Sequence, residues 1–183
     1  MSGRKSQAAG IAFESWINGQ HETANVIGIL AFVEKTEAHS RVIHGRVQFA
    51  EPGVADYIGC LVGNGRCMAV EAKSTADDHL MRSAVSTKQA KNLDSVAAAG
   101  GLALLLVEFR GQSRGQEAGR PVFRRYAVPW QEVPWQVLRT AQSVAEDSIQ
   151  QHRIVPDTCY LERFHPRGKP VGSVGRVRVY ASE

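Results

Sequence analysis

The sequence predicts an α/β fold in which a mixed β-sheet is flanked by helices. Residues 56 to 73 contain two extended runs joined by Gly63-Asn64-Gly65, whose residues tolerate positive φ, as in a β-hairpin. Residues 102 to 109 form an apolar run that is too short for a typical helix and is typical of a central strand buried on both faces. Because helical patterns precede and separate these runs, the order of elements indicates a sheet covered by helices.

The first expected element is an N-terminal helix. Residues 8 to 18 place Phe13, Trp16 and Ile17 at helical spacing, which gives the segment one apolar face. The pattern stops at Asn18-Gly19, a pair typical of a helix end. We therefore expect the helix to end there.

Extended segments follow this helix. Residues 25 to 34 are rich in β-branched and aromatic side chains and predict a strand. A second extended run covers residues 42 to 49. The hairpin of residues 56 to 73 then adds two adjacent antiparallel strands.

A helix and a buried strand follow the hairpin. Residues 84 to 99 are rich in helix formers and stop at Gly100-Gly101, which predicts a helix with a glycine terminator before the central strand. Residues 123 to 128 predict a further strand, and residues 130 to 148 a helix broken near Pro134.

The last residues differ in composition from the rest. Residues 150 to 183 are rich in proline and glycine and predict a loosely packed extension that ends in a short strand at residues 174 to 180. We therefore expect one domain over residues 1 to 149 and a basic C-terminal extension over residues 150 to 183.

Length and composition exclude several classes of protein. The chain has 183 residues, of which 43% are hydrophobic and 22% charged, which suits one globular domain and excludes two large ones. The longest aliphatic stretch, residues 96 to 107, is interrupted by two glycines and is shorter than the roughly 20 residues that span a bilayer. With no secretory signal pattern, the protein is expected to be cytoplasmic. The 3 cysteines lack CxxC spacing, which argues against a disulfide framework and a thiolate zinc site.

Basic charge is concentrated in the C-terminal part of the chain. The net charge is +4, from 22 Lys and Arg against 18 Asp and Glu. Residues 110 to 125 contain five arginines and one acid, and residues 163 to 178 contain four arginines, one lysine and no acid. Since the guanidinium fork suits phosphate oxygens, these clusters indicate a phosphodiester backbone as the partner.

The hairpin also carries a cluster of charged side chains. On a strand, residues two apart point to the same face, so Glu71 and Lys73 project together, with the Ala72 carbonyl between them. Asp56 begins the partner strand. Two adjacent carboxylates repel unless a hard divalent cation lies between them, and such oxygen ligands suit Mg²⁺, with Mn²⁺ as a substitute.

The ordered set of motifs resembles the PD-(D/E)xK nuclease superfamily, and within it most closely the RecU-type Holliday junction resolvases. The likeness spans about residues 4 to 135. It is carried by five segments: Gly10-Ile-Ala-Phe-Glu14, Ala55-Asp56-Tyr57-Ile-Gly59, Val70-Glu71-Ala72-Lys73, Lys88-Gln89, and Gly100-Gly101-Leu followed by residues 105 to 109. The resemblance implies a restriction-endonuclease-like fold and a homodimeric, Mg²⁺-dependent endodeoxyribonuclease that nicks four-way DNA junctions.

The resemblance also assigns roles to individual residues. It implies that Asp56, Glu71 and the Ala72 carbonyl bind the metal and that Lys73 orients the attacking water. It makes Glu14 a supporting glutamate on the first helix and Gln89 a helix glutamine close to the site. DNA contacts are expected from Arg4, Lys5, Arg41, Arg46 and Lys88.

The sequence departs from the family pattern in two places. Ala55 stands where a proline usually precedes the first aspartate, and the segment before Asp56 is short for the stalk that enters a junction. Residues 36 to 46 therefore form either a reduced stalk or only a β-hairpin. Two alternatives stay open: a nuclease of the same superfamily that acts on linear or flapped DNA, and a non-catalytic protein that binds junctions.

Overall fold

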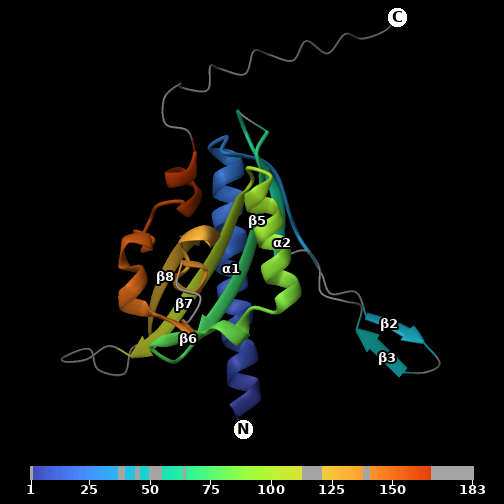
Figure 1. The fold of residues 1–183 in the computed structure, drawn as a ribbon, viewed down its shortest axis with the longest axis vertical. Coiled ribbons are helices and arrows are strands. Elements are labelled where there is room, and N and C mark those ends of the chain that lie inside the picture. Colours follow the sequence, from blue (N-terminus) through green and yellow to red (C-terminus); the bar gives the residue numbers. More distant parts are fainter. Residues whose placement is uncertain are drawn as a thin grey trace, which may run out of the picture.

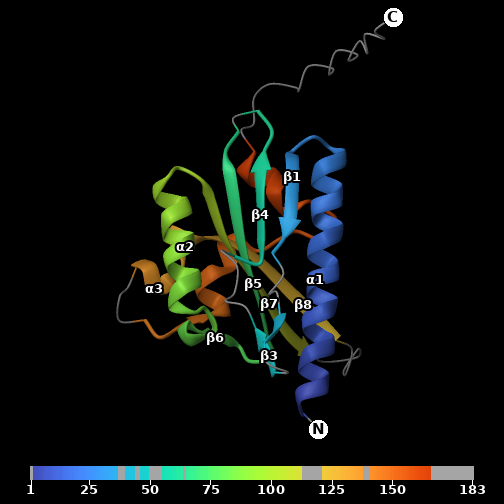
Figure 2. The same cartoon turned by 90° about the vertical axis from the view of Figure 1, so that its right-hand side faces the viewer.

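A five-stranded β-sheet lies between two long helices. The computed structural model describes residues 2–36, 40–43, 46–49, 55–63, 65–112, 121–137 and 141–165. Figure 1 shows α1 (Ser2–Val26) and α2 (Thr87–Ala98) running along the sheet, and the turned view in Figure 2 places the sheet between them. This arrangement confirms the predicted α/β class, with a mixed sheet flanked by helices.

The remaining elements are shorter. The strands are β1 (Leu30–Lys35), β2 (Ser40–Ile43), β3 (Arg46–Phe49), β4 (Tyr57–Leu61), β5 (Cys67–Thr75), β6 (His79–Met81), β7 (Leu102–Gln112), β8 (Pro121–Pro129) and β9 (Ser143–Ala145). A short helix, α3, covers Pro134–Val137. The 3-10 helices are Arg82–Ala84, Trp130–Glu132, Glu146–His152 and Tyr160–Phe164.

The sheet has the order β1-β4-β5-β7-β8. β5 and β7 are parallel, and the other neighbours in this sheet are antiparallel. The predicted hairpin is present as β4 and β5, with Tyr57 opposite Val70. β7 is the predicted central strand, and residues 101 to 109 are buried on both of its faces. This topology puts the end of β5 that carries residues 71 to 75 beside the second half of β7.

The two faces of β5 serve different layers of the molecule. Met68 and Val70 pack in the core under α1, whereas Ala69 packs in the core that includes Leu93 of α2. Alternation along the strand therefore turns Glu71 and Lys73 toward the α2 side and Ala72 toward α1.

The N-terminal helix is longer than the sequence pattern predicts. The expected end at Asn18-Gly19 is wrong, because both residues lie on the exposed face while His21 and Ala24 continue the buried stripe. The helix ends instead at Val26, shortly before Gly28, which has φ 74, and the amide of Ile29 donates to the Ala24 carbonyl at 2.8 Å, as in a Schellman motif. Neither α1 nor any other helix in the described ranges is long and apolar enough to cross a membrane.

The extended segments after α1 are also divided differently. The strand predicted for residues 25 to 34 begins only at Leu30, because residues 25 to 28 complete the end of α1. The run predicted for residues 42 to 49 is two strands, β2 and β3, which pair with each other in a sheet of their own. This hairpin stands apart from the main sheet in Figure 1.

The helix predicted for residues 130 to 148 is wrong. Trp130 starts a single 3-10 turn, where its indole donates to Asp94 of α2 at 2.7 Å, and Pro134 starts the four-residue α3. β9 then pairs with β6, so Val144 is buried in a strand. The buried aromatic side chains fix this segment against α2 and override its helical propensity.

The chain after residue 150 packs against α1 as far as the structure describes it. Tyr160 and Leu161 are buried in the core under α1, and the Tyr160 hydroxyl bonds to Nε2 of His21 at 2.6 Å. The predicted loose packing is therefore wrong for residues 150 to 165. Residues 166 to 183, with the strand expected at residues 174 to 180, lie outside the described residues.

Gly19 within α1 and Gly28 just after it give a matched pair of stability predictions. Gly28→Ala should lower the free energy of unfolding by about 1–2 kcal/mol, because Gly28 has a left-handed backbone. Gly19→Ala should raise it by up to about 1 kcal/mol, because Gly19 is helical and nothing lies within 4 Å of an added Cβ. Urea denaturation measures both. A loss of stability in Gly19→Ala would contradict a continuous α1.

Candidate active site

The candidate site is centred on a carboxylate that is completely buried. Glu71 lies in the second half of β5 opposite Leu105 of β7, and its side chain has no exposed surface. Its Oε1 accepts hydrogen bonds from Lys73 Nζ and from Gln89 Nε2 of α2. Its Oε2 is buried and has no partner among the described residues. A buried carboxylate with one bare oxygen is costly, which marks this position as functional rather than stabilising.

Gln89 is oriented by the start of its own helix. The Ser86 hydroxyl accepts from the Gln89 amide at 3.2 Å, and Oε1 of Gln89 accepts from the Ser86 amide at 2.9 Å, which completes a capping box. The side-chain nitrogen of Gln89 is thereby directed at Glu71. The role of Ser86 was missed from the sequence, although the Ser-x-x-Gln spacing carries the signal.

Asp56 lies across from Glu71 where β4 begins. Its Oδ2 accepts from the Ala72 amide at 2.8 Å, in place of a backbone partner, because β4 starts only at Tyr57. The amide and carbonyl of one strand residue point toward the same neighbouring strand, so the Ala72 carbonyl also faces the side of Asp56. Asp56, Glu71 and the Ala72 carbonyl are thus brought together.

The electrostatics of this cluster reflect its burial. Burial raises the pKa of Glu71 to about 7, and the negative charge of Asp56 adds to the rise, while Lys73 opposes it. The Lys73 side chain is 21% exposed, so its ammonium lies between the buried carboxylate and solvent. The cluster is therefore short of positive charge around two adjacent carboxylates.

These residues fit a hard divalent cation. The donors are two carboxylates and a carbonyl, and Glu71 Oε2 is an unpartnered oxygen that a cation would satisfy. Within the described ranges no three His, Cys, Asp or Glu side chains form a metal-binding group. Mg²⁺ typically binds to one or two carboxylates and keeps several waters, so this smaller set suits it better than it suits Zn²⁺.

Glu14 occupies a different position from the central cluster. Its carboxylate pairs with Lys35 of β1 at 2.6 Å, and its side chain is 45% exposed. Burial raises the pKa of Tyr57 to about 12, and the charges of Glu14 and Asp56 both add to that rise. Glu14 thus influences the residue next to Asp56, but its hydrogen bond goes to Lys35, whereas Lys73 bonds to Glu71.

The residues predicted to bind DNA are only partly described. Arg4 and Lys5 lie in the first turns of α1, and Arg41 and Arg46 lie in β2 and β3, but their side chains are outside the described part of the structure. Lys88 is exposed at the start of α2, next to Gln89. In Figure 1 the N-terminal end of α1, the β2–β3 hairpin and the C-terminal end of β5 all lie in the lower half of the molecule.

A buried network on the other face of the sheet was missed from the sequence. Glu108 of β7 is 1% exposed and accepts from the Ser74 hydroxyl and from Nε of Arg125, each at 2.9 Å. Ser74 immediately follows Lys73, so the network ties the end of β5 to β7 and β8. The isolated Glu108 in an apolar run was the available signal.

Comparison with known proteins decides the family. The family described as Recombination protein U (RecU) matches residues 10–155. The chain belongs to the RecU family. This confirms the resemblance seen in the sequence motifs of the RecU-type Holliday junction resolvases.

A solved structure of a resolvase is similar to this RecU-family chain. The structure of Hjc, a Holliday junction resolvase from the archaeal hyperthermophile Archaeoglobus fulgidus, matches with 16% identity and a TM-score of 0.43. The match covers 74% of this chain and 90% of that one. No curated protein matches the chain.

The raised pKa of Glu71 gives a prediction for stability against pH in EDTA. The folded state holds a proton on Glu71 up to about pH 7, whereas the unfolded value is 4.5, so stability should fall as pH rises through this window. Glu71→Gln should remove this component, and it should make the protein more stable than wild type at pH 8. Urea denaturation at pH 5.5 and pH 8 measures the difference. Identical pH profiles for the two proteins would contradict the assignment.

Proposed function

We propose that this RecU-family protein is a metal-dependent endodeoxyribonuclease that cleaves four-way DNA junctions, with Mg²⁺ as the natural cofactor and Mn²⁺ as a substitute. The observation that carries the proposal is the buried Glu71 carboxylate beside Asp56, with one oxygen left bare. The family supports a junction-resolving nuclease. The structure adds a cluster with the donors that such chemistry needs.

The proposed mechanism assigns a task to each side chain. Asp56, Glu71 and the Ala72 carbonyl would hold the cation, which would lower the pKa of a bound water and neutralise charge on the phosphodiester. Lys73, between Glu71 and solvent, orients the attacking water. That water adds to phosphorus and loses a proton to solvent, and the P–O bond to the leaving sugar oxygen breaks as that oxygen takes a proton from solvent.

Other residues support these tasks. Gln89 fixes the orientation of Glu71, since its amide nitrogen donates to Oε1 while its oxygen is held by Ser86. Glu14 adds negative charge close to Tyr57, the residue that follows Asp56. We assign Arg4, Lys5, Arg41, Arg46 and Lys88 to contacts with DNA phosphates, because the elements that carry them lie in the half of the molecule where β5 ends.

Substitution of the two carboxylates tests the proposed function. Asp56→Ala and Glu71→Ala should each lower the cleavage rate at least about a hundredfold, because each removes a group that stabilises the transition state through the cation. Junction binding should persist, and in the absence of metal it should tighten because a charge that repels phosphates is gone. Glu22→Gln, an exposed change on α1, is the matched control.

The assay uses an end-labelled four-way junction, a linear duplex and a flap, each with Mg²⁺, Mn²⁺ or EDTA. Paired symmetric nicks confined to the junction are the expected result. Cleavage of duplex or flap at the same rate would instead support a nuclease for linear or flapped DNA. Absence of metal-dependent cleavage of all three substrates would overturn the proposal and favour a junction-binding protein.

We further propose that the protein acts as a C2 homodimer. Two strands of opposite polarity must be cut at a symmetric junction, and two active sites related by a twofold axis meet that requirement. Light scattering at working concentration should give twice the chain mass of 20.0 kDa. A 20.0 kDa species both with and without junction would contradict the dimer.

A further inference from the structure

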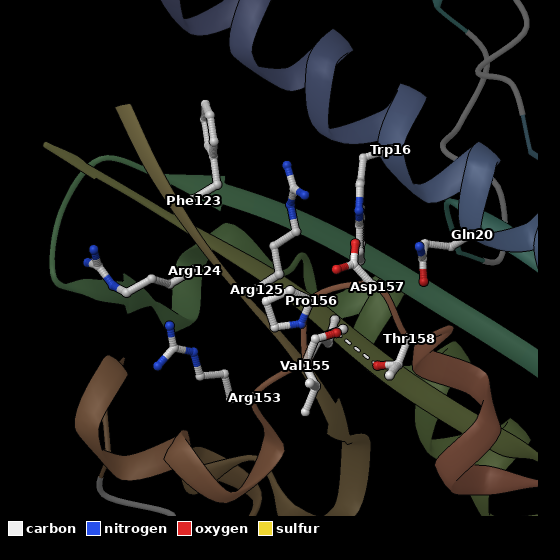
Figure 3. Close-up of a pocket in the computed structure, with 11 residues that line it drawn as sticks. Trp16, Gln20, Phe123, Arg124, Arg125, Arg153, Val155, Pro156, Asp157 and Thr158 are labelled. Carbon is white, nitrogen blue, oxygen red and sulfur yellow. Dashed lines mark hydrogen bonds between the residues drawn. The ribbon is translucent and has the colours of Figure 1, made fainter. Parts of the chain in front are cut away.

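A groove rich in arginine lies beside the edge strand β8, away from the cluster around Glu71. It has a volume of about 290 Å³ and lies between α1, β8 and residues 153 to 158. Figure 3 shows its three arginines, Arg124, Arg125 and Arg153, together with the aromatic side chains of Trp16 and Phe123. We call it the arginine groove.

Two of the arginines are held in place by acids outside the groove. Arg124 forms a two-point pair with Glu146, with Nη2 at 2.8 Å from Oε2. Arg125 donates through Nε to the buried Glu108, and its guanidinium lies 4.3 Å from the centre of the Trp16 ring. A guanidinium has five N–H donors, so Arg125 keeps donors for a ligand and loses little conformational entropy when it uses them. Arg124 is adjacent to Arg125 on β8 and its side chain points away from Arg125 and Trp16 (Figure 3).

The third arginine of the groove is the most exposed of the three. Glu146 and Glu108 pair with Arg124 and Arg125, whereas Arg153 is exposed and its guanidinium forms no hydrogen bond within the described part of the chain, although its charge also acts on Glu146. Asp157 is the acid among the described lining residues, and it opposes an anionic ligand. The formal charges of the groove and its two paired acids therefore sum to zero, and its attraction for an anion depends on Arg153 acting against Asp157.

The aromatic lining indicates which form of nucleic acid fits. Phe123 is 47% exposed, with the Arg125 guanidinium 5.5 Å from its ring centre, and Val155 on the rim is 61% exposed. Bases in a duplex have both faces covered by their neighbours, so only an unpaired base can place a face on such a ring. Arginines for phosphates and an exposed ring for a base are the features of a site for a single strand.

The position of the groove relates it to the Glu71 cluster. Ser74, next to Lys73, pairs with Glu108 of β7, which in turn pairs with Arg125 of β8. Two strand spacings, roughly 10 Å, therefore separate the backbone of Arg125 from that of Ser74. The groove lies at the same end of the sheet as the Glu71 cluster, two strands farther along and on the opposite face, which α1 covers.

From these observations we propose that the arginine groove binds an unpaired DNA strand at the same end of the sheet as the cleavage site. The inference rests on the proposed function in that it takes DNA as the substrate. It adds that the substrate includes unpaired nucleotides, with a base on Phe123 and a phosphate on Arg153.

Binding of a labelled single-stranded oligonucleotide and of the matching duplex, in EDTA, tests this proposal with the full chain. Phe123→Ala should weaken binding of the single strand roughly tenfold and leave duplex binding unchanged, because it removes a stacking platform. Arg153→Ala should weaken single-strand binding and lower the slope of log affinity against log salt by about 0.7. Asp157→Asn should tighten it, since asparagine tolerates the φ of 63 at this position.

The matched control is Arg66→Gln, which removes one positive charge just before β5, at the end of that strand far from the groove; because Arg66 also donates to the carbonyls of Gly100 and Gly101, urea denaturation checks that the variant is folded. It should leave single-strand binding within twofold of wild type. The proposal is overturned if Phe123→Ala leaves single-strand binding unchanged, or weakens duplex binding equally. Failure of the nuclease assignment would appear in the cleavage assay and not here, because EDTA prevents metal-dependent cleavage and only binding is measured.

Discussion

The buried carboxylate of Glu71 is the constraint around which the central part of the structure is arranged. A charge without exposed surface requires donors, and they come from Lys73 on the same strand and from Gln89 on α2. Gln89 reaches Glu71 from the first turn of α2, which begins at Thr87 directly after the Ser86 cap. One oxygen of Glu71 still has no partner in the described structure. The arrangement therefore lowers the stability of the fold, and a bound cation would satisfy the free oxygen.

Side-chain contacts between neighbouring strands also connect β5 to the face of the sheet that α1 covers. Ser74, Glu108 and Arg125 form a buried hydrogen-bonded line across β5, β7 and β8, and Arg125 then stacks on Trp16 of α1. The helix that carries Glu14 is thereby fixed relative to the strand that carries Glu71. The same line holds one wall of the arginine groove, which links the geometry of the two regions.

The sequence predicted the elements whose signals are local. Gly63 and Gly65 determine the β4–β5 turn, and the alternation around Glu71 places its side chain with Lys73. It failed where tertiary packing overrides a local pattern: Gly19 lies on an exposed helical face and does not end α1, and Trp130 binds to α2 where a continuous helix was expected. The roles of residues such as Glu108 depend on neighbours distant in sequence, and no spacing rule reports those contacts.

Calorimetric titration of Mn²⁺ into the protein tests the central claim that the Glu71 cluster is a divalent cation site. Wild type and the control Glu22→Gln should show the same saturable binding, whereas Glu71→Gln and Asp56→Asn should lose it, because each replaces a charged oxygen ligand with an amide. Equal Mn²⁺ affinity in wild type and Glu71→Gln would contradict the claim.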